Sequence, residues 1–258
     1  NIHQSGEQIT SIRFNPLKHH DEVIHQSEIV NRQSKISWTT NGYYLQSRPS
    51  FTLDPLFHAG TYYVQEASSM FLEQAVKQTT DTSQPLLVLD LCAAPGGKST
   101  LLQSIISKES LLVSNEVIQS RVNILKENLI KWGSSNMIVT NNDPKDFSKL
   151  SGLFDVVVID APCSGSGLFR RDAAAINEWS EANVQLCSQR QQRILADAWN
   201  CLKEDGLLIY STCSYSTDED EEIMDWMMEG LKVEGIRLKV VEEWNIVEVQ
   251  STTGAYGY

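Results

Sequence analysis

The stretch Leu89–Thr100, LDLCAAPGGKST, decides the fold because it joins an apolar run to a glycine turn and then to a helical pattern. Its last four residues, Gly97–Thr100, look like the end of an ATP phosphate loop. Such a loop places another glycine five positions before this one, and Cys92 stands there instead. The dinucleotide pattern G-x-G-x-x-G also fails, because the two glycines are adjacent. The turn therefore serves either the close approach of a ligand other than a triphosphate or packing alone.

Length and composition are those of a globular protein with one large domain, or with a core and a smaller companion. The chain has 258 residues, of which 41% are hydrophobic. No stretch approaches the ~18 apolar residues of a membrane helix, and residues 1–15 lack the order of a signal peptide, so we expect a cytoplasmic protein. Five cysteines without a disulfide framework or metal-ligand spacing predict reduced thiols and no metal site.

The net charge of −12 argues against a nucleic-acid partner, since phosphate binding usually shows as a basic surface. The acid is unevenly placed, however. Residues 216–243 hold ten Asp and Glu against three Lys and Arg, and the rest of the chain carries only −5. The block STDEDEEIMDWMMEG at 216–230 is typical of a helix whose acidic first turn favours the helix dipole. We interpret this block as a solvated face without a function.

From residue 86 onward, short β-rich runs alternate with amphipathic helical patterns. The runs are 86–91, 111–116, 136–140, 154–160 and 206–212. Unbroken β-branched runs such as VVVI are typical of strands buried on both faces, hence of a parallel sheet with right-handed crossovers. The predicted fold is therefore α/β, a doubly wound Rossmann-like sheet. Apolar residues at helical spacing mark two of the crossovers: Ile118, Val122, Leu125 and Leu129 in one, and Val184, Cys187, Ile194, Ala198, Trp199 and Leu202 in the other.

Residues 1–75 lack this alternation and predict a small N-terminal appendage, α/β or helical, while 76–258 form the main domain. In an open parallel sheet the ligand crevice lies beyond the carboxyl ends of the strands. The polar or small residues where the runs stop are therefore candidates for one site. They are the turn Ala93–Lys98, Glu116, Asp143, residues 160–163 and residues 211–213.

Two acidic residues near strand ends suggest a nucleoside ligand. Glu116 follows Gly97 by 19 residues, close to the ~20-residue offset at which a carboxylate binds a ribose hydroxyl pair. A solvated carboxylate before a helix is the alternative. Asp143 precedes a proline, and its spacing favours a cap of the next turn over a contact with an adenine amino group. A glycine turn and a ribose acid without a phosphate loop fit S-adenosylmethionine.

Two cysteines follow neighbouring strands, Cys163 in DAPCSGSG and Cys213 in YSTCSYS. A thiol in such a polar or glycine-rich turn can be exposed and can have a lowered pKa. Asp160, three residues before Cys163, completes an acid and thiol pair. Cys187 and Cys201 lie in the helical pattern and are interpreted as small buried hydrophobes.

At this point the sequence resembles a known family. The blocks LDLCAAPGGKST, DAPCSGSGLFRRD and YSTCSYSTDEDE are similar, in order and spacing, to the signature blocks of the Sun-type RNA (cytosine-5) methyltransferases, including bacterial ribosomal RNA methyltransferases. SIRFNPLK (11–18) and YYVQEASSM (62–70) resemble the N-terminal blocks of that family. The likeness runs from about residue 11 to the end, and the paired cysteines make it specific.

The resemblance implies an S-adenosylmethionine-dependent enzyme and assigns roles by position. Cys213 would be the nucleophile, Cys163 would help to release the product, Asp160 would contact the base and Pro162 would shape its pocket. Asp143 becomes an adenine ligand rather than only a cap. The cofactor site implied by the resemblance consists of Cys92, Ala93, Ala94, Pro95, Gly96, Gly97, Lys98, Glu116, Asp143 and Asp160.

The implied partner is RNA, and we expect ribosomal RNA. We expect no membrane partner, and we expect the enzyme to be a monomer. Candidate contacts to the RNA backbone are Arg13, Lys18, His19, His20, Lys145, Arg170 and Arg171. The chain starts at Asn1 and stops at TTGAYGY (252–258), where the family usually continues, so we expect a truncated protein. Two rival functions stay open: a methyltransferase of a small molecule or protein, and a non-catalytic RNA-binding assembly factor.

Overall fold

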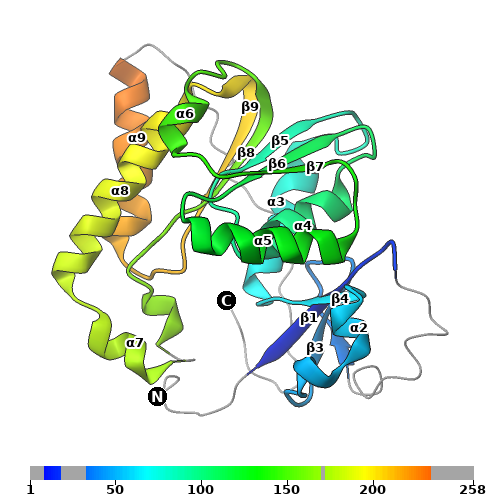
Figure 1. The fold of residues 1–258 in the computed structure, drawn as a ribbon. Helices are drawn as coiled ribbons and strands as arrows, with labels where there is room; N and C mark the ends of the chain where they lie inside the picture. The colour runs from blue at the N-terminus through cyan, green and yellow to red at the C-terminus, as the bar shows by residue number, and fades with distance from the viewer. Residues whose placement is uncertain (1–8, 19–32, 170–171, 234–258) are drawn as a thin grey trace.

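Two β-sheets form the framework of the computed structural model, which describes residues 9–18, 33–169 and 172–233 (Figure 1). The larger sheet has five parallel strands in the order β7-β6-β5-β8-β9. Its strands are β5 (Leu87–Asp90), β6 (Leu111–Asn115), β7 (Met137–Thr140), β8 (Phe154–Asp160) and β9 (Leu202–Ser211). This order confirms the doubly wound α/β prediction, with the strands close to the predicted runs.

Helices cover both faces of the parallel sheet because its central strands are apolar on both faces (Figure 1). Leu89 packs with α8 and α9 on one face, and its neighbour Val88 packs with α3 and α4 on the other. The helices are α3 (Leu72–Thr79), α4 (Gly97–Ile105), α5 (Gln119–Trp132), α6 (Pro144–Phe147), α7 (Ala173–Glu178), α8 (Glu181–Trp199) and α9 (Glu221–Val233). The 3-10 turns η5 (Ser166–Leu168) and η6 (Thr217–Glu219) follow β8 and β9.

The predicted helical pattern was wrong at its C-terminal end. It included Leu202, but α8 ends at Trp199 and Leu202 begins β9, where it pairs with Phe154. Leu202 also packs against the core cluster beneath α8, so its apolar character serves the same core from a strand. The spacing of a single apolar residue does not show whether that residue ends a helix or begins the next strand.

The N-terminal part forms a separate antiparallel sheet in the order β2-β3-β1-β4. Its strands are β1 (Thr10–Phe14), β2 (Gln33–Lys35), β3 (Gly42–Leu45) and β4 (Tyr62–Val64), accompanied by η3 (Phe51–Leu53), α2 (Pro55–His58) and η4 (Ser68–Phe71). A mixed α/β appendage therefore forms, rather than a helical one. The expected boundary at residue 75 falls inside α3.

Arg13 of β1 connects this sheet to α4, the helix that follows the glycine turn. Its guanidinium is 1% exposed and donates to Thr100 Oγ1 (2.6 Å), to Gly97 O (3.3 Å) and to Gln65 Oε1 (2.8 Å). It also lies over the Trp132 ring, 4.6 Å from the centroid. Burial lowers the pKa of Arg13 to about 9. The fit of α4 against the N-terminal sheet thus depends on a buried cation.

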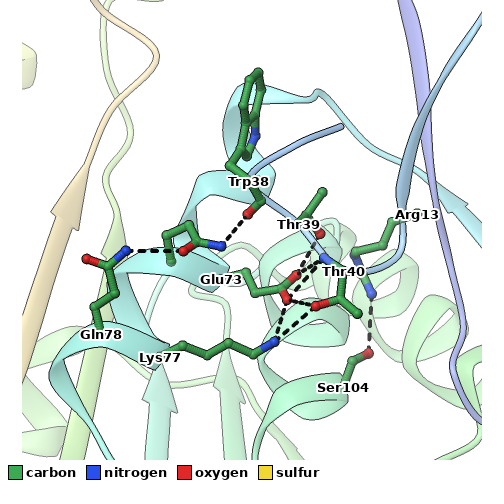
Figure 2. Close-up of polar contacts among 9 residues, drawn as sticks. Arg13, Trp38, Thr39, Thr40, Glu73, Lys77, Gln78 and Ser104 are labelled. Atoms are coloured by element: carbon green, nitrogen blue, oxygen red, sulfur yellow. Dashed lines mark hydrogen bonds and ion pairs between the residues drawn. The ribbon is translucent and has the colours of Figure 1, made fainter. Parts of the chain in front are cut away.

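A second buried polar cluster fixes the loop after β2 to α3 (Figure 2). Glu73 is 2% exposed and accepts hydrogen bonds from Thr39 Oγ1 (2.6 Å) and Lys77 Nζ (2.6 Å). The backbone N–H and the hydroxyl of Thr40 also donate to it. Because its donors belong to the N-terminal part and α3, Glu73 serves the fold rather than the strand ends of the larger sheet.

Candidate active site

The strand order places the switch point of the sheet between β5 and β8. From β5 the chain winds outward through β6 and β7, and then returns to β8 and β9 on the other side of β5. Ligands of such sheets bind beyond the carboxyl ends of the strands at this point. The turn after β5 and the two cysteine loops after β8 and β9 therefore lie at the same edge.

The glycine turn is held by its neighbours. Gly96 is the N-cap of α4 with φ +111°, in the left-handed region that suits glycine. Arg121 Nη2 donates to Ala94 O (2.7 Å), and Asn128 Nδ2 donates to Pro95 O (2.8 Å), so α5 fixes the turn from outside. These contacts leave a preformed turn at the N-terminus of a helix, where backbone N–H groups are unpaired.

An acidic cluster surrounds this turn. Asp90, fully buried at the end of β5, accepts from Ser99 Oγ (2.6 Å), while its Oδ1 has no hydrogen-bond partner among the described residues. Burial raises the pKa of Asp90 to about 7. Burial, with the nearby charges of Asp90, Glu116 and Asp160, raises the pKa of Cys92 to about 12, so this thiol is neutral. The sequence analysis missed Asp90, although an acid ending an apolar strand is a detectable signal.

Glu116 and Asp143 occupy different surroundings. Glu116 is 2% exposed, so it is not the solvated carboxylate that was the alternative interpretation. Its Oε1 accepts from Ile118 N (2.9 Å), and its Oε2 pairs with Arg121 Nη1 (3.3 Å). Asp143 caps α6 by accepting from Lys145 N (3.1 Å), as its spacing predicted. The roles of both carboxylates toward a nucleoside stay predictions.

The two cysteine loops meet. Cys163 Sγ lies 3.0 Å from Cys213 Sγ, and Cys213 is exposed. The hydrogen bond from Cys163 is the largest cause that lowers the pKa of Cys213, to about 7. The same contact, together with burial, raises the pKa of Cys163 above its ordinary value. The directions of the two pKa shifts, and not the symmetric contact itself, correspond to a Cys213 thiolate that accepts a hydrogen bond from a Cys163 thiol.

Asp160 links the cysteine loops to the glycine turn. Its Oδ2 forms an ion pair with Lys98 Nζ (2.7 Å), and its Oδ1 accepts from Ser211 Oγ (2.9 Å). The side chain of Asp160 is 40% exposed, so the carboxylate is held on two sides and still open to a ligand. Lys98 thus joins the predicted cofactor turn to the predicted catalytic acid.

Glu219 contradicts the interpretation of the acidic block as a solvated face. It is 0% exposed and accepts from the backbone N–H of Ser164 (2.8 Å) and from Ser214 Oγ (2.6 Å), the residues directly after the two cysteines. Sequence reasoning missed it because five consecutive acids, 218–222, do not show which one turns inward.

The predicted RNA contacts have mixed outcomes. The prediction for Arg13 was wrong, since its guanidinium is buried against α4. Lys18 Nζ donates to Ala59 O (2.9 Å) and Lys131 O (2.5 Å), so it joins α2 to the end of α5. Lys145 is exposed, 3.9 Å from Asp143. His19, His20, Arg170 and Arg171 lie outside the described residues.

Two family models cover nearly the whole chain. The model described as 16S rRNA methyltransferase RsmB/F matches residues 77–254. The chain belongs to this family. The model for the N-terminal domain of 16S rRNA methyltransferase RsmF matches residues 2–67, so the antiparallel sheet corresponds to a domain of the RsmB/F family as well. The resemblance inferred from the cysteine blocks is confirmed.

Curated relatives in the RsmB/F family carry the name ribosomal RNA small subunit methyltransferase F. The protein from Psychromonas ingrahamii is 38% identical over 192 residues, covering 73% of this chain and 40% of the relative. The protein from Pectobacterium atrosepticum is 34% identical over 226 residues, covering 84% of this chain and 46% of the relative. The chain thus spans less than half the length of these relatives.

The solved structures include a methyltransferase homolog protein from Pyrococcus horikoshii, with a TM-score of 0.74 and 28% identity. The match covers 88% of this chain and 72% of the archaeal one.

No helix in the described ranges is both long and apolar enough to span a bilayer. Within the same ranges, no group of three or more His, Cys, Asp or Glu side chains is arranged to hold a metal ion.

Proposed function

We propose that this chain is the catalytic part of an S-adenosylmethionine-dependent methyltransferase that methylates C5 of a cytosine in ribosomal RNA. The observation that carries the proposal is the contact of Cys163 with Cys213 beside the Asp160–Lys98 pair, next to the glycine turn. Membership of the RsmB/F family supports the same reaction and substrate.

The residues around the glycine turn fit S-adenosylmethionine. This cofactor is cationic at its sulfonium and amino groups, and the turn lies near the acidic side chains of Asp90, Glu116 and Asp160, of which the last two pair with Arg121 and Lys98. Among the described residues Oδ1 of Asp90 has no hydrogen-bond partner, so it is a buried acceptor that a ligand N–H could satisfy. Within the same residues Glu116 accepts from two donors, whereas a carboxylate offers about four acceptor positions, so it can still bind a ribose diol.

Cys213 would start the reaction. Its lowered pKa provides thiolate near neutral pH, and its exposure lets a base reach the sulfur. Addition of the thiolate to C6 of cytosine breaks the C5–C6 double bond and makes C5 nucleophilic. The bound cofactor would supply the electrophilic methyl group and leave as S-adenosylhomocysteine. A C5–CH3 bond would form as the bond from that methyl to sulfur breaks. Transfer of the C5 proton to water would then re-form the C5–C6 double bond as the C6–S bond breaks, which returns the electron pair to the Cys213 thiolate.

Asp160 and Cys163 would act on the same base. The Asp160 carboxylate, fixed by Lys98 and Ser211, is placed to hydrogen-bond the N3/N4 edge of cytosine and to stabilise charge that develops there. Cys163 would assist release by hydrogen bonding the departing Cys213 sulfur at 3.0 Å. Pro162, directly before Cys163, would shape the base pocket.

The RNA would have to present its target base outside a helix. C6 of a stacked cytosine is out of reach of a thiol in a protein loop, so the base lies in a single strand or is flipped out. The net charge of −12 means that basic surface must come from few residues or from other parts of the full-length protein.

The test of this proposal is incubation of the full-length protein with methyl-labelled S-adenosylmethionine and small-subunit ribosomal RNA, followed by nucleoside analysis. Label in 5-methylcytidine is the expected result. Label in protein or small molecules instead would favour the rival enzyme. No transfer by the folded full-length protein would favour an RNA-binding assembly factor.

A further inference from the structure

The cysteine loops after β8 and β9 share one buried carboxylate. Glu219 Oε1 accepts from Ser164 N (2.8 Å), and Glu219 Oε2 accepts from Ser164 Oγ (2.5 Å) and Ser214 Oγ (2.6 Å). Ser164 follows Cys163, and Ser214 follows Cys213. One side chain therefore bonds to the residue next to each thiol.

A third element completes this arrangement. Gln191 of α8 is 0% exposed, and its Nε2 donates to Glu219 Oε1 (3.2 Å) and to Pro162 O (3.0 Å). Glu219 itself is fixed by its turn η6, whose last residue it is, and by Tyr210, whose hydroxyl donates to Glu219 O (2.7 Å). The carboxylate thus sits on a rigid support between α8 and β9.

Four donors among the described residues occupy the acceptor positions of the Glu219 carboxylate. Hydrogen bonds to a carboxylate are stronger than those between neutral groups. The loops are also linked directly. Gly167 N donates to Cys213 O (2.7 Å), and Tyr215 N donates to Ser166 Oγ (2.8 Å). Ser214 Oγ lies 3.4 Å from Ser164 Oγ and 3.3 Å from Ser166 Oγ. Removing the carboxylate would therefore loosen the contact between the loops without removing every connection.

We propose that Glu219 is a positioning residue that clamps the two cysteine loops, so that Cys163 Sγ stays within hydrogen-bonding distance of Cys213 Sγ. The importance of Glu219 for methyl transfer rests on the function proposed above. The effect of Glu219 on the thiols is independent of that function, because the distance between the sulfurs determines how readily Cys213 ionises. A solvated acid in the same block would have no such effect.

The experiment measures the alkylation rate of Cys213 by iodoacetamide against pH in the full-length protein, with the modified peptide quantified by mass spectrometry. In wild type the midpoint of the profile should lie near 7. In Glu219→Ala it should move toward the ~8.5 of a free cysteine, because the hydrogen bond from Cys163 is lost. Glu219→Gln should stay close to wild type, since its amide can still bond to both serines and to Gln191.

Glu73→Ala is the matched control. Glu73 is 2% exposed and also accepts hydrogen bonds from four donor groups of described residues, but those groups belong to Thr39, Thr40 and Lys77 (Figure 2). Its removal should lower stability without moving the Cys213 midpoint. An unchanged midpoint in folded Glu219→Ala, or an equal shift in Glu73→Ala, would overturn the proposal.

A second variant covers the case in which Glu219→Ala does not fold. Ser164→Ala combined with Ser214→Ala removes both donors to Oε2 and keeps the carboxylate, and it should raise the midpoint in the same direction. Methylation assays on the same preparations separate the two claims. A shifted midpoint with no methyl transfer even in wild type would contradict the proposed function while supporting the clamp. Methyl transfer in wild type with an unshifted midpoint in the folded Ser164/Ser214 double variant would contradict the clamp alone.

Discussion

Cys163 and Cys213 have the same side chain but differ in exposure and in the direction of their pKa shifts. The hydrogen bond between them lowers the pKa of Cys213 and raises that of Cys163. Cys213 is also the more exposed of the two. A nucleophile must be both ionised and reachable, and on this ground we propose Cys213 for attack and Cys163 as its hydrogen-bond donor.

The pH dependence of the first step follows from this pair. Thiolate forms as the pH rises through the pKa of Cys213, so covalent attachment to RNA should increase with pH around a midpoint near 7. Cys163→Ala removes the hydrogen bond that lowers this pKa, and the midpoint should move to higher pH. Single-turnover rates of adduct formation between pH 5.5 and 9.5 give both curves. Superimposable curves would show that Cys163 does not control the ionisation of Cys213.

Glu116 provides a second prediction at this scale, on the cofactor. If Glu116 is the ribose acceptor, Glu116→Ala should weaken S-adenosylmethionine binding by about 1–3 kcal/mol, because the ribose hydroxyls would lose their partner in a buried site. Calorimetry on wild type and variant measures the difference, and a thermal melt checks that the variant is folded. Unchanged affinity in a folded variant would remove Glu116 from the site. ATP should compete poorly, since the turn lacks the phosphate-binding glycine.

At the scale of elements, η5 packs directly on the Cys213 loop. A Cβ added at Gly167 would lie 2.3 Å from the carbonyl oxygen of Cys213, too close for any atom. Gly167→Ala should therefore push the two loops apart and reduce methylation at least ten-fold, by the same loss of sulfur contact that Glu219→Ala produces.

Gly230 of α9 is the matched control for this change. A Cβ there meets no atom of the described residues within 4 Å, and alanine favours a helix over glycine by about 0.5–1 kcal/mol. Gly230→Ala should keep full activity and raise the free energy of unfolding slightly. Full activity in Gly167→Ala would contradict the close contact of η5 with Cys213. Chemical denaturation and methylation assays on both variants provide the comparison.

Much of the framework could be predicted at this scale, because each strand run is apolar and each ends in a polar or small residue. Asp160, Cys163 and Cys213 stand at strand ends, where the topology of a parallel sheet brings distant segments together. Asp90 ends β5 and could have been chosen in the same way, whereas Gln191 and Glu219 could not. These last two polar residues differ from their neighbours in the sequence because they are buried. Burial depends on tertiary packing, which the periodicity of a polar or acidic stretch does not reveal.

At the scale of the whole molecule, Arg13 connects the N-terminal sheet with the methyltransferase sheet. Arg13→Gln should lower the free energy of unfolding by about 2–4 kcal/mol, because Gly97 O, Thr100 Oγ1 and Gln65 Oε1 lose a buried donor. The salt dependence of RNA binding should not change, since a buried guanidinium touches no phosphate.

Lys145→Gln should have the opposite effects on stability and on the salt dependence of RNA binding. Lys145 is exposed, so its loss should leave stability within about 0.5 kcal/mol. If it contacts a phosphate, the slope of log affinity against log salt should fall by about one. Urea titrations and salt-dependent filter binding separate the two residues. A reduced slope in Arg13→Gln with unchanged stability would contradict the buried position of Arg13.

The central claim is that Cys213 attacks the base and that Cys163 assists release. The most direct test is a denaturing gel of full-length protein with small-subunit ribosomal RNA and S-adenosylmethionine, comparing wild type, Cys163→Ala, Cys213→Ala and the double variant. Cys163→Ala should give a persistent RNA-shifted band that is absent from Cys213→Ala and from the double variant, because attack occurs and release is slow. A band in Cys213→Ala that disappears in the double variant would make Cys163 the nucleophile and contradict the account.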